Sequence, residues 1–210
     1  MIKFDTVEDC VNQYFDYDSI PEINVVEMGL YVGNTAYRII DNLQNKNIKV
    51  SSFTAFDSFC GLPEEKYGVT RSEDWAPGNF SALEAFGVNT LSEAINLVQN
   101  KIKPIYAQGI RIIPGWFKDT LTQDLATTVD EIDFFHIDTD LFISTEQALN
   151  WAFSNHLIKS GCIIRYDDIA SCGPAWGQQL AHTRATYHYN IIFERLSFNV
   201  YRVVDYEKRV

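Results

Sequence analysis

Short apolar runs alternate along this chain with stretches that have helical spacing, and no other feature of the sequence constrains the fold as strongly. Brief apolar runs bounded by turn residues are typical of buried strands, and strands that alternate with helices indicate βαβ units. The sequence therefore predicts a doubly wound α/β fold with a mainly parallel sheet. We expect strands at residues 24–28, 50–56, 110–113, 132–137 and 161–166, followed by a hairpin at 191–196 and 200–204.

The helical stretches and their connections fit one domain over residues 1–210. A chain of 210 residues without an internal repeat or a linker rich in glycine, proline and serine has the size of a single domain. Residues 1–20 form a helical N-terminal extension in this interpretation, and residues 58–80 form a loop. We expect helices at residues 6–17, 34–43, 91–101, 119–125, 145–156 and 177–188.

The charge of the chain limits its partners. A formal net charge of -11 at pH 7 would be repelled by phosphate backbones and by anionic lipid, so we expect no nucleic acid and no membrane as partners. The opening sequence, MIKFDTVEDC, has acids where a signal peptide has apolar residues, and no apolar run is long enough to span a membrane. The four cysteines form no CxxC pair. These features predict a cytoplasmic protein.

Two glycines frame the turn after the first predicted strand. In the segment VVEMGLYVGNT, Glu27 ends the strand, and Gly29 and Gly33 bound the turn into a helix that begins near Thr35. Glycine permits a tight turn and a close approach of ligand to backbone, and the free N–H groups of the helix start attract polar ligands. The spacing is not the GxGxxG of dinucleotide sites. An ordinary structural turn is the alternative.

The second predicted strand ends in an acid. The strand ends in Asp57, about 20–30 residues after the glycine turn, a position from which a carboxylate can accept hydrogen bonds from both hydroxyl groups of a ribose. The alternative is that Asp57 forms a loop cap or a turn. With the glycine turn, it predicts a nucleoside site.

A second cluster of acids follows the strands at 132–137 and 161–166. Asp138 comes directly after the first of these strands, and Asp167 and Asp168 come after the second. If the strands are adjacent, these carboxylates repel one another unless a cation or protons intervene, and oxygen ligands favour Mg²⁺, then Mn²⁺ or Ca²⁺. Asp140 either caps the following helix or stays in the loop. The alternative is that all these acids are solvated turn residues.

Several segments together resemble the macrocin O-methyltransferase family, a branch of the class I methyltransferases that use S-adenosylmethionine. The similarity covers most of the chain in the family order, and the combination of DSFxGLPE, GWFxDTL and DxDLxxST is much more specific than any one motif. The similar segments are VVEMGLYVGNT, FDSFCGLPE, GNF at 78–80, IPGWFKDTL at 113–121, HIDTDLFIST at 136–145 and RYDDI at 165–169.

The resemblance implies a Rossmann-like sheet of seven strands whose last strand is antiparallel. It also implies that S-adenosylmethionine is the cofactor and that Mg²⁺ binds at the carboxylates, with Asp138 as the base for the substrate proton. The implied sites are Glu27, Gly29 and Thr35 at the methionine end, Asp57 at the ribose with Ser58 beside it, Gly115 and Trp116 near the adenine, and Asp138, Asp167 and Asp168 at the metal.

The acceptor is less well defined than the cofactor. The family usually has tyrosine where Phe142 stands and often an acid where Cys60 stands. A hydroxyl of a sugar or of another small molecule, such as a phenol, is expected, and Trp75, Trp116 and Trp176 either line its pocket or pack in the core or lid. His136 is expected to face the core, and His182 is a minor candidate for a functional role.

Two other classes of protein compete with the methyltransferase. A nicotinamide-dependent oxidoreductase would need GxGxxG and a proton relay such as Tyr/Lys, which the sequence does not contain. A non-catalytic protein that keeps the fold as a binding module is the other alternative. The sequence leaves open whether the chain forms a homo-oligomer.

Overall fold

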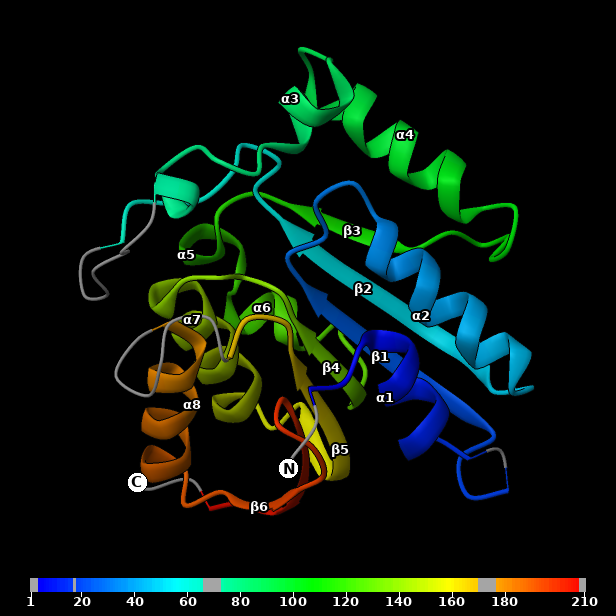
Figure 1. The fold of residues 1–210 in the computed structure, drawn as a ribbon, viewed down its shortest axis with the longest axis vertical. Helices are drawn as coiled ribbons and strands as arrows, with labels where there is room; N and C mark the ends of the chain where they lie inside the picture. Colours follow the sequence, from blue (N-terminus) through cyan, green and yellow to red (C-terminus); the bar gives the residue numbers. More distant parts are fainter. Residues whose placement is uncertain (1–3, 17, 66–72, 170–176, 208–210) are drawn as a thin grey trace.

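The computed structural model describes residues 4–16, 18–65, 73–169 and 177–207, and its centre is a seven-stranded sheet (Figure 1). The strand order is β3-β2-β1-β4-β5-β7-β6. The first five strands pair in parallel, whereas β7 runs antiparallel to both β5 and β6. The predicted doubly wound sheet with an antiparallel last strand is thereby confirmed. The strands are β1 (Glu22–Met28), β2 (Lys49–Asp57), β3 (Arg111–Pro114), β4 (Ile132–Ile137), β5 (Ile158–Tyr166), β6 (Ile192–Arg195) and β7 (Val200–Asp205).

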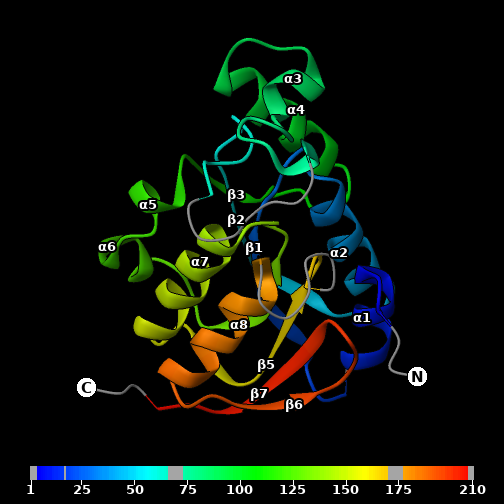
Figure 2. The same ribbon diagram turned by 60° about the vertical axis from the view of Figure 1, so that its left-hand side comes forward.

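Helices cover both faces of the sheet (Figures 1 and 2). One face carries α1 (Val7–Tyr14), α2 (Asn34–Asn45), α3 (Ala82–Phe86) and α4 (Leu91–Ile102). The other carries α5 (Phe117–Thr120), α6 (Gln123–Ala126), α7 (Phe142–Ser154) and α8 (Gly177–His188), and a short 3₁₀ helix, η1, spans Glu73–Trp75. Within the described ranges, no helix has the length and apolar character that a membrane crossing requires.

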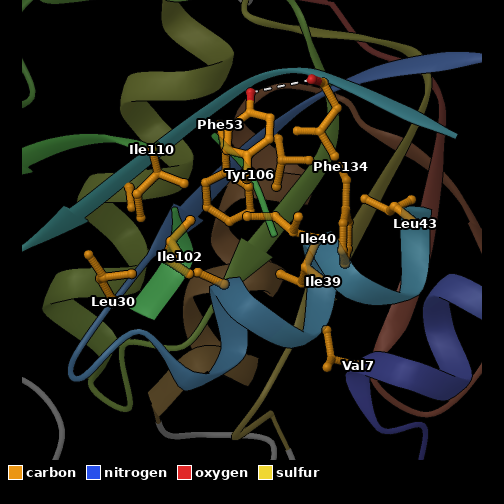
Figure 3. Close-up of a cluster of buried hydrophobic side chains, with 14 of the residues drawn as sticks. Val7, Leu30, Ile39, Ile40, Leu43, Phe53, Ile102, Tyr106, Ile110 and Phe134 are labelled. Carbon is orange, nitrogen blue, oxygen red and sulfur yellow. Dashed lines mark hydrogen bonds between the residues drawn. The ribbon is translucent and has the colours of Figure 1, made fainter. Parts of the chain in front are cut away.

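Each face of the sheet has its own apolar core. Successive residues of a strand point to opposite faces, so Val25 of β1 packs in the core under α2, and Val26 packs in the core under α7 and α8. Figure 3 shows Phe53 and Tyr106 gathered between α2 and the sheet, where the Tyr106 hydroxyl donates to the Val50 carbonyl at 3.3 Å. Packing in the two cores holds the strands in place, so the carboxyl ends of the parallel strands meet at one edge of the sheet.

Several element boundaries differ from the sequence predictions by one to three residues. Helix α7 begins at Phe142 rather than 145, because the Glu65 carboxylate accepts from the Ile143 N–H at 3.0 Å and satisfies the helix start from a distant loop. Strand β5 begins at Ile158 rather than 161. The stretch at 119–125 is divided into α5 and α6, because Thr122 caps the second helix.

Candidate active site

A cavity of about 890 Å³ opens at the carboxyl ends of the parallel strands. In an open α/β sheet this edge is where ligands bind. Eight of the residues predicted for cofactor or metal line it, namely Gly29, Asp57, Ser58, Gly115, Trp116, Asp138, Asp167 and Asp168. The other three predicted residues lie outside the lining: Glu27 is fully buried within β1, Gly33 precedes α2 in a left-handed conformation, and Thr35 is half-buried in the first turn of α2.

Gly29 allows the backbones of two loops to meet at the cavity floor. Its φ is +89°, and a Cβ at this position would lie 1.7 Å from the carbonyl oxygen of Asp138. The contact is fixed from both sides, because the Gly29 N–H donates to Phe56 O at 2.9 Å and the Asp138 N–H donates to Met28 O at 2.8 Å. Glycine is therefore required here, and a ligand can approach bare backbone above it.

Asp57 ends β2 with its carboxylate held by backbone N–H groups. Its two oxygens accept from Tyr31 N at 2.7 Å and from Phe59 N at 2.6 Å. Burial raises the pKa of Asp57, and these hydrogen bonds oppose the rise. The neighbouring Ser58 hydroxyl donates to Gly61 O at 2.8 Å, so Ser58 shapes the loop. Each carboxylate oxygen retains acceptor capacity for a ligand hydroxyl.

The loop after β3 forms the adjoining wall. Gly115 has a φ of +131° and donates its N–H to Asp57 O at 2.8 Å, which ties this loop to the end of β2. Trp116 follows as the N-cap residue of α5 and lines the cavity. The predicted ribose and adenine residues are therefore neighbours in space.

Two of the three predicted metal ligands, Asp138 and Asp167, meet at the cavity, together with His136, which was not predicted as a ligand. One ligand atom each of His136, Asp138 and Asp167 lie within 4.8 Å of one another, and Asp168 and Asp140 line the same space. Burial raises the pKa of Asp138 well above its usual value, and repulsion from Asp167, Asp168 and Asp140 raises it further. The carboxylate oxygens of Asp138, Asp167 and Asp168 in this poorly solvated site fit a hard divalent cation, which would relieve the repulsion.

The raised pKa of Asp138 predicts how metal and pH affect stability. The pKa of Asp138 is higher in the folded protein than in the unfolded chain, where it is about 4. The folded state is therefore favoured at low pH, and this contribution to the free energy of unfolding is lost as the pH rises through the raised pKa. We expect saturating MgCl₂ to raise Tm by roughly 5–10 °C at pH 8 and much less at pH 5. Thermal scans with NaCl at matched ionic strength are the control. An equal rise at both pH values would contradict a carboxylate metal site.

Arg165 supports the cluster from within the sheet, and the sequence analysis did not single it out. Its guanidinium is buried, and Nη1 donates to Asp167 Oδ1 at 2.7 Å. Nε and Nη2 donate to the carbonyl oxygen of Asp5 at 3.3 and 3.1 Å, and Asn199 Nδ2 donates to the same oxygen at 3.0 Å. The segment that precedes α1 is thus hydrogen-bonded to the residue that orients Asp167.

Aromatic side chains form the outer part of the cavity. Tyr31 and Phe80 pack edge to face with ring centroids 6.4 Å apart, and both rings are exposed. Trp75 lines the cavity as expected and donates its indole N–H to Asp140 at 2.9 Å. Asp140 therefore stays in the loop and does not cap α7. The sequence analysis missed Tyr31 and Phe80 as lining residues, and Trp176 lies outside the described residues.

The two candidate histidines are buried. His136 is fully buried in β4, as expected, and its Nε2 lies 4.0 Å from Glu27 Oε1. His182 does not line the cavity; its Nδ1 is 3.0 Å from the Tyr166 hydroxyl, and burial lowers its pKa to about 4. His182 therefore contributes to the packing of α8 against the sheet.

Comparisons with known proteins point to one family. A family model described as macrocin-O-methyltransferase (TylF) matches residues 2–186. Demethyldecarbamoylnovobiocin O-methyltransferase from Streptomyces niveus is 22% identical over 174 residues, which are 82% of this chain and 62% of that protein. The chain thus spans less than two thirds of that relative.

Two solved structures share the fold. The O-methyltransferase NovP superposes with a TM-score of 0.60 at 21% identity, covering 97% of this chain and 78% of that chain. The calicheamicin methyltransferase CalS11 gives a TM-score of 0.67 at 16% identity, covering 93% and 76%. Together they show that the sheet and its helices follow the architecture of these methyltransferases.

Proposed function

This chain belongs to the macrocin-O-methyltransferase family, and from that premise we propose that it is an S-adenosylmethionine-dependent O-methyltransferase assisted by Mg²⁺. The proposed reaction methylates a hydroxyl group of a small molecule or sugar. One observation carries the proposal: the half-buried carboxylate of Asp57 and the cluster around Asp138 face a single cavity. A nucleoside cofactor and a metal-held hydroxyl would meet there.

The shape and polarity of the cavity support the cofactor. Bare backbone at Gly29 and the carboxylate of Asp57 suit the methionine end and the ribose of S-adenosylmethionine. We assign Glu27, Gly29, Gly33 and Thr35 to the methionine end, Asp57 and Ser58 to the ribose, and Gly115 and Trp116 to the adenine. Glu27, Gly33 and Thr35 lie outside the cavity lining, so they would act indirectly. They shape the backbone, and Glu27 sets the charge, beneath the residues that contact the cofactor.

The carboxylate cluster supports metal-assisted proton removal. Asp138, Asp167 and Asp168 would hold Mg²⁺, which supplies positive charge that lowers the pKa of a bound hydroxyl. S-adenosylmethionine, when bound, would supply an electrophilic methyl group on a sulfonium. A carboxylate oxygen of Asp138 would accept the hydroxyl proton of the acceptor. The residues that line the cavity would hold the acceptor hydroxyl and the methyl group in line, which would lower the activation barrier of methyl transfer by several kcal/mol.

The acceptor is proposed only as a class. The names of two similar proteins refer to novobiocin and calicheamicin, so we propose an acceptor from natural-product biosynthesis for this chain. The exposed rings of Tyr31 and Phe80 would pack on a sugar or a phenolic ring. Both classes of hydroxyl therefore belong in a substrate screen.

Isothermal titration with S-adenosylhomocysteine tests the proposal. We expect micromolar binding by the wild type, and at least tenfold weaker binding by Asp57→Asn, because the amide NH₂ that replaces one carboxylate oxygen cannot accept a hydrogen bond and the negative charge is lost. Asp133→Asn is the matched control: Asp133 is a buried strand acid that pairs with Lys159 at 2.5 Å and does not line the cavity. No binding by folded wild type would refute the methyltransferase and favour another nucleotide or a scaffold role.

A further inference from the structure

Three neighbouring strands each place one polar side chain in the same buried row. Glu27 of β1 is in register with His136 of β4, which is in register with Arg165 of β5. Glu27 and His136 are fully buried, and Arg165 is 3% exposed. Among the residues that the structure describes, neither carboxylate oxygen of Glu27 has a hydrogen-bond partner, and neither does His136 Nε2. Buried polar atoms without partners call for an explanation.

The row has a defined hydrogen-bond direction. Arg165 Nη1 lies 3.4 Å from His136 Nδ1. A guanidinium has only donors, so Nδ1 must accept, and the single ring proton is left on Nε2. That N–H faces Glu27 Oε1 at 4.0 Å, which is too long for a hydrogen bond. His136 therefore directs the Nε2–H toward the Glu27 carboxylate without forming a hydrogen bond to it.

We infer that His136 is a positioning residue for Glu27. Its Nε2–H, fixed by the contact of Arg165 with Nδ1, donates to the Glu27 carboxylate in the cofactor complex and holds that buried charge beneath a cationic group bound above Gly29. The inference rests on the proposed function, because the ammonium of the cofactor's methionine end is that cationic group. Gly29 lies two residues beyond Glu27 and lines the cavity. Polar contacts that are long in a free enzyme shorten in the complex, and the gap between Nε2 and Oε1 is expected to close when the cofactor binds.

Two substitutions at His136 separate positioning from packing. His136→Phe keeps an aromatic ring and removes both nitrogens, whereas His136→Gln packs less well but accepts from Arg165 and donates to Glu27. We expect roughly tenfold weaker S-adenosylhomocysteine binding for the phenylalanine variant and binding within about threefold of wild type for the glutamine variant. His182→Phe is the matched control at a buried histidine outside the row, and thermal unfolding checks that each variant is folded.

The outcomes distinguish this inference from the proposed function. If wild type binds and His136→Phe binds equally well, or if both variants lose affinity alike, His136 has a packing role and the inference is overturned. If wild type does not bind, the proposed function fails, and the inference fails with it.

¹⁵N NMR of histidine-labelled wild type tests the inference without a substitution. We expect the Nε2–H tautomer at His136 and a change in the Nε2 chemical shift when S-adenosylhomocysteine binds. The Nδ1–H tautomer would overturn the inference.

Discussion

Asp138→Asn is expected to lower kcat by roughly 10²–10⁴-fold, the range lost when a general base is removed. The substitution keeps the shape of the side chain but removes the negative charge that would attract both the acceptor proton and the cation. Asp138 lines the cavity beside Asp167 and Asp168, where a carboxylate can reach the hydroxyl proton of a bound acceptor. Initial rates with a methylated product as readout give kcat and KM separately.

The same variant should still bind the cofactor. Asp57 and Gly29 are untouched by the substitution, so we expect S-adenosylhomocysteine affinity close to that of wild type. Mn²⁺ affinity should fall, because one oxygen ligand loses its charge. Asp133→Asn, at the opposite end of the same strand, is the control for a lost strand carboxylate. If Asp138→Asn retains turnover within tenfold of wild type, Asp138 is not the base.

What could be predicted from the sequence depended on features local in the chain. Asp57 is the last residue of its strand, and Asp138 and Asp167 come directly after theirs. Once the strands are assigned to one parallel sheet, their carboxyl ends must meet at one edge, so no long-range information was needed to bring these acids together. The glycine turn could be predicted too, because Gly29 and Gly33 follow the first strand directly in the sequence.

What could not be predicted depends on contacts between distant segments. Glu65 satisfies the start of α7 from 78 positions away, and Arg165 binds the carbonyl of Asp5 from 160 positions away. The row of Glu27 and His136 exists only because β1 and β4 pair in one register, and local patterns in the sequence do not reveal which strands pair or in what register. Each of these features depends on residues that are far apart in the chain.

Gly29→Ala is expected to cost more stability than any other single methyl group added to the site. The new Cβ would lie 1.7 Å from the Asp138 carbonyl oxygen, a backbone atom that cannot rotate away. Hydrogen bonds to Phe56 and from Asp138 to Met28 hold both backbones in place, so relief requires the ends of β1 and β4 to separate. We expect a loss of about 4 kcal/mol or more, equivalent to a Tm decrease of roughly 10 °C, and no measurable S-adenosylhomocysteine binding.

Gly161→Ala isolates the clash from the backbone conformation. Gly161 has a φ of +90°, matching the +89° of Gly29, but a Cβ there has no atom within 4 Å. The control therefore carries only the strain of a left-handed residue, about 1–3 kcal/mol, and should bind the cofactor normally. Chemical denaturation of both variants measures the difference directly. If both variants lose the same free energy of unfolding, backbone strain alone makes glycine necessary at position 29. The contact between Gly29 and the Asp138 carbonyl would then not be the reason for glycine there.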